Sequence, residues 1–94
     1  MFLHLGSDVV VNMADVIAIL DLDVTSTSKI TREFLTVAEE EGFVVNVPGD
    51  LPKSFVITET GNESRVYISP ISSQTLLKRA RGNGGFSHED IISI

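Results

Sequence analysis

The chain has 94 residues, 43% of them hydrophobic, no cysteine and a formal net charge of −6. This length fits one domain, the lack of cysteine excludes disulfides and thiolate sites, and the acidic charge argues against indiscriminate attraction to phosphate or anionic membranes. No run approaches the roughly 18 apolar residues of a membrane span, and the first residues do not match a secretion signal, so we expect a cytoplasmic protein.

The first quarter of the chain predicts three strands. Apolar runs at 2–5 and 9–11 flank a Gly-Ser-Asp turn, which is typical of a hairpin. A short turn at 12–15 leads into a strand over 16–23, whose apolar residues on both faces predict cover on both sides. One predicted face of this strand holds Val16, Ala18, Leu20 and Leu22, and the other holds Ile17 and Ile19.

The middle of the chain predicts a helix over 28–41 followed by a strand over 43–47. Apolar residues recur at helical spacing within the helix, namely Ile30, Phe34, Val37 and Ala38. Ser26, Thr27 or Ser28 can cap its start, and Gly42 is placed to end it in a left-handed conformation.

The second half predicts a hairpin and a second helix. A loop at 48–52 precedes strands at 53–58 and 64–69, which are joined by a turn at Gly61-Asn62. Ser72 or Ser73 caps a helix over 74–81 that stops at Gly82. We therefore expect an α+β domain over 1–81, with a small mixed or antiparallel sheet and two helices, and a flexible tail over 82–94.

No catalytic, metal or cofactor site is predicted. Asp21 and Asp23 share a strand face, but no further oxygen ligands are spaced to complete a cation site. His4 and His88 lack an orienting partner, so a packed histidine is the simpler interpretation. The glycines at 82, 84 and 85 follow a helix, the reverse of the order in a phosphate loop. We expect a binding protein that is not an enzyme and has no small-molecule substrate.

Basic residues concentrate late in the chain. Residues 1–50 carry nine acids and two bases, a net of −7, whereas residues 51–94 carry five bases and four acids, a net of +1. Residues 64–88 contain bases and no acid. The candidate phosphate contacts there are Arg65, Tyr67, Lys78, Arg79 and Arg81. The last three also suit the end of a helix dipole, so that simpler role stays open.

Acidic residues offer an alternative partner. Glu39, Glu40 and Glu41 lie at the end of the first predicted helix, where the dipole disfavours negative charge. Hydration of the helix end and pairing with a neighbouring subunit both explain them. A second hypothesis is therefore an oligomeric adaptor whose acidic face binds a protein and not DNA. That face would comprise Asp15, Asp21, Asp23 and Glu39 to Glu41.

Five segments of the chain together carry a resemblance to a known family: His4 to Gly6, Asp15 to Asp21, Pro52 to Thr58, Tyr67 to Ser73 and Thr75 to Arg79. In these segments the chain resembles the extracellular matrix regulatory protein B family, RemB-like proteins of spore-forming Firmicutes that are related to the matrix regulator RemA. The likeness covers roughly residues 1–81.

The resemblance implies a domain similar to LytTR-type DNA-binding modules, assembled into a ring that binds DNA and regulates biofilm matrix genes. A ring would multiply a modest basic site, and the high apolar content fits a homo-oligomer. The RemA branch has arginines where this chain has Asp15, Asp50 and Leu51, and Lys53 keeps a base near that loop. The resemblance therefore adds Lys53 to the predicted DNA contacts.

Overall fold

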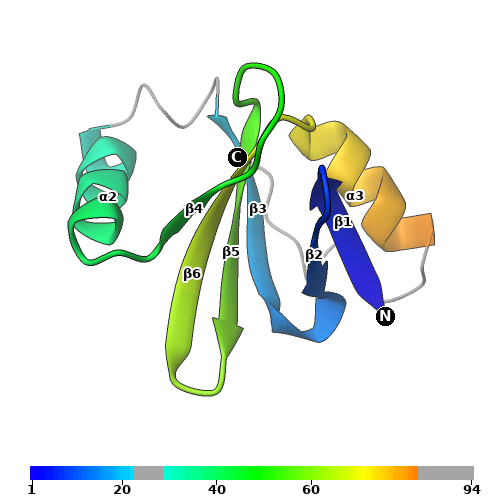
Figure 1. Ribbon diagram of the computed structural model, residues 1–94, viewed down its shortest axis with the longest axis horizontal. Coiled ribbons are helices and arrows are strands. Elements are labelled where there is room, and N and C mark those ends of the chain that lie inside the picture. The colour runs from blue at the N-terminus through cyan, green and yellow to red at the C-terminus, as the bar shows by residue number, and fades with distance from the viewer. Residues whose placement is uncertain (23–28, 83–94) are drawn as a thin grey trace.

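The computed structural model describes residues 1–22 and 29–82, with side chains from residue 32 onward in the second range. These ranges form a small α+β fold with two α-helices and two sheets, which confirms the predicted fold class (Figure 1). The predicted tail lies outside them from residue 83. The elements are β1 (Phe2–Gly6), β2 (Val9–Asn12), the 3-10 turn η1 (Met13–Asp15), β3 (Val16–Asp21), α2 (Lys29–Glu40), β4 (Val44–Asn46), β5 (Ser54–Thr60), β6 (Glu63–Ser69) and α3 (Ser73–Gly82).

β1 and β2 form the predicted antiparallel hairpin, with Leu3 opposite Val11. Because side chains alternate along a strand, Leu3 and Val11 point into the core while Phe2 and Val10 point outward. Phe2 is 64% exposed and Val10 is 52% exposed. The hairpin therefore has a buried apolar face and an outer face that also carries apolar side chains.

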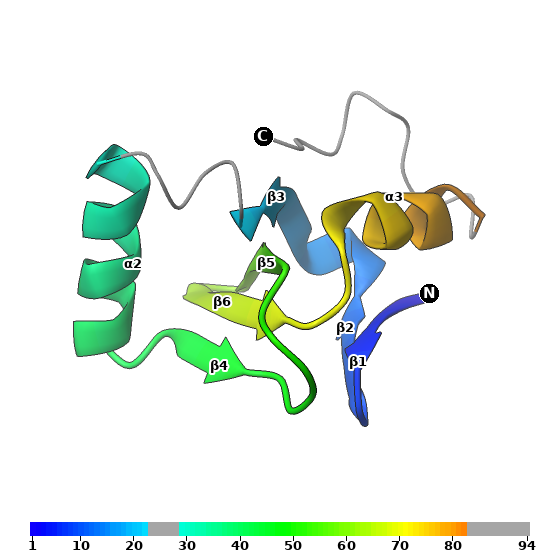
Figure 2. The same cartoon turned by 90° about the horizontal axis from the view of Figure 1, so that it is seen from above.

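The other four strands form a sheet in the order β3-β5-β6-β4, in which β4 is parallel to β6 and the other pairs are antiparallel. Figure 2 shows α2 on one side of this sheet and α3 with the hairpin on the other. Each side has its own core. Ala38, Phe55 and Val66 centre the α2-side core, and the hairpin-side core includes Leu3 and Leu76.

β3 is covered on both faces, as predicted, because Ala18 and Ile19 are both buried and belong to opposite sides of the sheet. The predicted grouping of Val16 with Ala18 is wrong. The pairing with β5 shifts register between these two residues, so Val16 joins the hairpin-side core and Ile17 is left exposed. A bulge of this kind interrupts the alternation that the prediction assumed.

α2 matches the predicted helix, and Gly42 has the left-handed φ of 79° expected just beyond its end. The candidate caps at 26–28 lie outside the described residues. Ala38 is buried and Leu35 packs beside it, but Phe34 and Val37 are 43% and 55% exposed. The apolar arc of α2 is therefore wider than the part that the sheet covers.

Hydrogen bonds of three buried serines connect α3 and the segment before it to the rest of the fold. Ser54 donates from Oγ to the Ile71 carbonyl at 2.7 Å. Ser69 donates to the Leu5 carbonyl at 2.7 Å and accepts from the Ile71 N–H at 3.0 Å. Ser73 donates to an Asp21 carboxylate oxygen at 3.2 Å. Ser54, Ser69 and Ser73 therefore hold the start of α3, and the segment that precedes it, against the sheet and β1.

Ser72 is the N-cap of α3. Its hydroxyl accepts from the Thr75 N–H at 3.2 Å and its carbonyl accepts from the Leu76 N–H at 3.0 Å. These are the bonds expected of a capping serine, so Ser72 and not Ser73 fills the predicted role.

Candidate nucleic-acid interface

The outward side of α3 carries three cations, Lys78, Arg79 and Arg81, which we call the α3 basic face. Leu76 and Ala80 are buried on the opposite side of the helix, which packs against β1 and β3. All three cations are exposed, and residues 73–82 contain no acid. Cations in the last turn of a helix also complement its dipole, so the basic face is compatible with a stable helix.

Arg79 forms a hydrogen bond with the β1–β2 hairpin. Its Nη1 donates to the His4 carbonyl at 3.3 Å, which joins the end of α3 to β1. A guanidinium has five N–H donors, so this single bond leaves most of them available to another acceptor. The contact limits where the Arg79 side chain points without consuming its capacity to bind phosphate.

Lys53 lies apart from the α3 basic face. Its N–H donates to the Ser69 carbonyl at 2.9 Å and its carbonyl accepts from the Leu22 N–H at 3.0 Å, so the backbone is fixed while the side chain is exposed. The neighbouring Ser54 bonds to Ile71, just ahead of α3. Lys53 is therefore near the beginning of α3, and the three cations are near its end.

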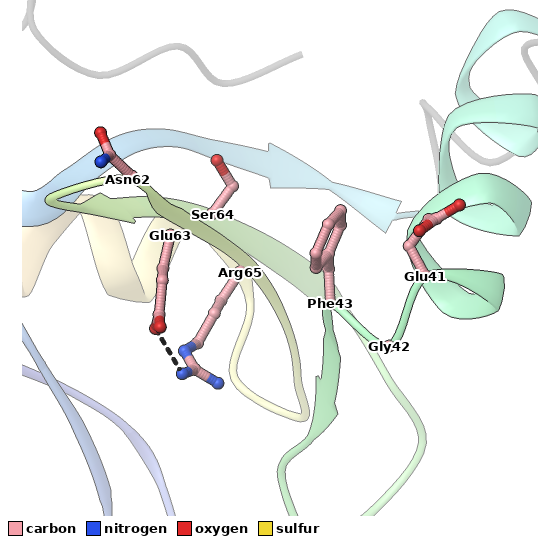
Figure 3. A pocket seen from close by; sticks show the side chains of 7 residues that line it. All are labelled: Glu41, Gly42, Phe43, Asn62, Glu63, Ser64 and Arg65. Atoms are coloured by element: carbon pink, nitrogen blue, oxygen red, sulfur yellow. Dashed lines mark hydrogen bonds and ion pairs between the residues drawn. The ribbon is translucent and has the colours of Figure 1, made fainter.

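Arg65 forms a salt bridge with a neighbouring acidic residue. It lies on β6, two strands from β3 in the sheet, and pairs with Glu63 at 2.9 Å. Both side chains border a shallow hollow of about 360 Å³ between the β5–β6 turn and the end of α2. Figure 3 shows Arg65 directed toward Glu63 and away from Glu41. Residues 64–88 contain no acid, but Glu63, the partner of Arg65, directly precedes this segment.

Tyr67 packs inward and is only half-exposed. It contacts the hairpin-side core and lines a second hollow, of about 200 Å³, together with Asn12, Asp15 and Thr58. Of the six predicted DNA contacts, the structure thus brings together Lys78, Arg79 and Arg81, and places Lys53, Arg65 and Tyr67 elsewhere.

The predicted acidic face is also divided. Asp15 accepts from the Thr60 hydroxyl at 2.9 Å and Asp21 accepts from Ser73, so both carboxylates have partners within the chain. Asp23 lies outside the described residues. Glu39 to Glu41 are exposed at the end of α2.

Candidate catalytic and metal-binding groups do not assemble. His4 is exposed and donates from Nε2 to the Ser7 carbonyl at 2.6 Å within the hairpin, so it is hydrogen-bonded but not packed as expected. His88 is outside the described ranges. Across residues 1–22 and 29–82, no three His, Asp or Glu side chains gather in a way that could hold a metal ion. In the same part of the chain, no helix is long and apolar enough to cross a membrane.

Sequence reasoning missed two features of these surfaces. Glu63 was not recognised as the partner of Arg65, although the two residues are separated by one position on the same strand face. The hollow around Asp15 and Tyr67 was also missed. Its lining comes from β2, η1, β5 and β6, so no local motif could reveal it.

Two comparisons with known proteins point to the same family. Residues 2–80 match the family model for RemA-like proteins, described as extracellular matrix regulatory protein A-like. The chain is also 40% identical over 81 residues to extracellular matrix regulatory protein B of Bacillus subtilis (strain 168), covering 86% of this chain and 91% of the relative. The chain therefore belongs to the RemA-like family of extracellular matrix regulatory proteins.

Proposed function

We propose that this protein is a self-associating transcriptional regulator of extracellular matrix genes that binds DNA phosphates through the α3 basic face. The observation that carries the proposal is the segregation of Lys78, Arg79 and Arg81 on the outside of an acid-free helix, in a chain whose net charge is −6. Such segregation lets an acidic protein present a locally cationic surface. The protein acts in the cytoplasm by binding and not by catalysis.

Self-association supplies the affinity that one helix lacks. Three phosphate contacts give modest binding, whereas copies held side by side, in a ring similar to that of the RemA branch and built from LytTR-like domains, add their contacts on one duplex. The exposed apolar residues of α2 and of the hairpin support such an assembly, because soluble monomers rarely leave several large apolar side chains exposed together.

The test is the fluorescence anisotropy of a labelled duplex at low and high salt. If one protomer makes three phosphate contacts, its affinity falls about 40-fold between 50 and 200 mM salt, and more steeply if several copies bind. Lys78→Glu is expected to weaken binding about fivefold to tenfold at 50 mM salt, and the triple change Lys78→Glu, Arg79→Glu and Arg81→Glu is expected to abolish it.

Arg65→Glu is the matched control, because it makes the same change in net charge at a residue that already pairs with Glu63. Equal losses in Lys78→Glu and Arg65→Glu would show that only overall charge matters and would contradict an interface on α3. Wild-type retention of DNA no greater than that of an unrelated acidic protein would defeat DNA binding altogether.

The adaptor hypothesis rests on a narrower surface than the sequence indicates. Because Asp15 and Asp21 are bonded within the chain, Glu39 to Glu41 are the described residues of the predicted acidic face that remain exposed for a protein partner. Glu40→Lys with Glu41→Lys tests it without disturbing the Asp21–Ser73 contact. Loss of a protein partner in that variant, with no loss in Lys78→Glu, would favour the adaptor.

A further inference from the structure

The hollow between the β1–β2 hairpin and the sheet has a mostly polar lining. It is lined chiefly by polar side chains from four elements: Asn12, Asp15, Thr58, Thr60 and Tyr67. Thr58 is only 4% exposed, and Asp15 and Tyr67 are half-buried. Its volume of about 200 Å³ is equivalent to six or seven water molecules at about 30 Å³ each, enough for one small polar group.

The charge of the lining indicates the charge of the ligand that would fit the hollow. Asp15 is its one ionised side chain, and no lysine or arginine borders it. Thr60 bonds to one carboxylate oxygen of Asp15 at 2.9 Å. Among the described residues, the other Asp15 oxygen and the Tyr67 hydroxyl have no hydrogen-bond partner. The hollow therefore offers a fixed anion and a hydroxyl to a donor that brings positive charge.

A metal ion fits this lining poorly, since hard cations take six or more oxygens and commonly several carboxylates, and one carboxylate is present. An organic cation fits better. A planar guanidinium or a compact ammonium presents N–H donors that match a carboxylate and neighbouring hydroxyls.

We propose that this hollow, centred on Asp15 and Tyr67, binds one guanidinium or alkylammonium group. The group pairs with the Asp15 carboxylate and is oriented by the hydroxyls of Thr58 and Tyr67. It can come from a small amine or from a basic side chain of a second copy. The site is separate from the α3 basic face and does not depend on DNA binding.

The chain contains its own reporter for this site. Tyr67 is the single tyrosine and there is no tryptophan, so intrinsic fluorescence excited near 280 nm comes from the wall of the hollow. The full chain, without DNA, is titrated with methylguanidinium up to millimolar concentration at constant ionic strength, because a ligand of so few atoms is expected to bind weakly. Methyl phosphate is the anionic probe in a parallel titration.

We expect a saturable change in fluorescence with methylguanidinium and none with methyl phosphate. Asp15→Asn, which keeps an oxygen for Thr60, is expected to weaken the response at least tenfold, and Thr58→Val at least twofold. Asp50→Asn is the matched control at an exposed loop acid and is expected to match wild type. Circular dichroism melts establish that each variant is folded at the temperature of the titration.

The same probe identifies the source of the group. If a second copy supplies it, methylguanidinium and Asp15→Asn both lower the mass measured by light scattering, and if a free amine supplies it the mass is unchanged. Either result supports the site. No saturable response, an equal response in Asp15→Asn, or an equal response to methyl phosphate would overturn it.

Discussion

At the scale of single residues, Gly49 has the least room for a side chain among the glycines of residues 1–22 and 29–82. It has a φ of 149°, and a Cβ built there would lie 2.7 Å from Cγ of Pro70. Gly49→Ala therefore combines backbone strain with a clash against a ring that cannot bend away. We expect it to lower the free energy of unfolding by about 2–4 kcal/mol, measured by urea denaturation.

Gly61→Ala separates these two causes. Gly61 also has a positive φ, of 61°, but a Cβ there meets nothing within 4 Å. Backbone strain alone costs about 1–2 kcal/mol. If Gly49→Ala is no more destabilising than Gly61→Ala, the close approach of Pro70 has no energetic weight.

At the scale of elements, Ser69 connects three parts of the fold. It is fully buried in β6 and bonds to the carbonyl of Leu5 in β1 and to the N–H of Ile71 ahead of α3. Ser69→Ala leaves both backbone groups without this partner in the interior. We expect a loss of about 1–3 kcal/mol in chemical denaturation. Ser64→Ala, an exposed change on the same strand, is the control and is expected to stay within about 0.5 kcal/mol.

The elements were predictable where the signal is local. The first hairpin, the end of α2 at Glu40 just before Gly42, and the turn at Gly61 follow from alternation, helical period and glycine, which act within a few residues. The parallel pairing of β4 with β6 and the bulge in β3 depend on contacts between distant segments. No local period encodes them.

The candidate site was predictable to the same limit. Lys78, Arg79 and Arg81 form one surface because a single helix presents them, and the sequence contains that information. Arg65 and Tyr67 share a strand face with each other, yet β6 lies two strands from β3 in the sheet, whereas α3 contacts β1 and β3. To predict that Arg65 and Tyr67 lie apart from the cations of α3, the order of the strands in the sheet must be known, and the sequence does not give that order.

At the scale of the whole molecule, two apolar areas lie at opposite ends. Phe34 and Val37 are exposed on α2, and Phe2 and Val10 are exposed on the hairpin. Figures 1 and 2 place the sheet between these two elements. One copy cannot cover its own areas, but α2 of one copy can cover the hairpin of the next. Different surfaces meeting in this way produce a ring when the rotation closes.

A mixing experiment distinguishes this arrangement from a symmetric dimer. We expect Val37→Lys and Phe2→Lys each to reduce the assembly to monomers, because a lysine in an apolar contact is buried without a partner. Phe2 is chosen on the hairpin because Val10 borders the hollow that holds Asp15. In a head-to-tail contact, the Val37→Lys copy keeps an intact hairpin and the Phe2→Lys copy keeps an intact α2. An equimolar mixture should then form dimers of one copy of each, detected by sedimentation velocity. A contact in which α2 meets α2 leaves Val37→Lys monomeric but Phe2→Lys assembled, and a wild-type monomer at working concentration contradicts self-association itself.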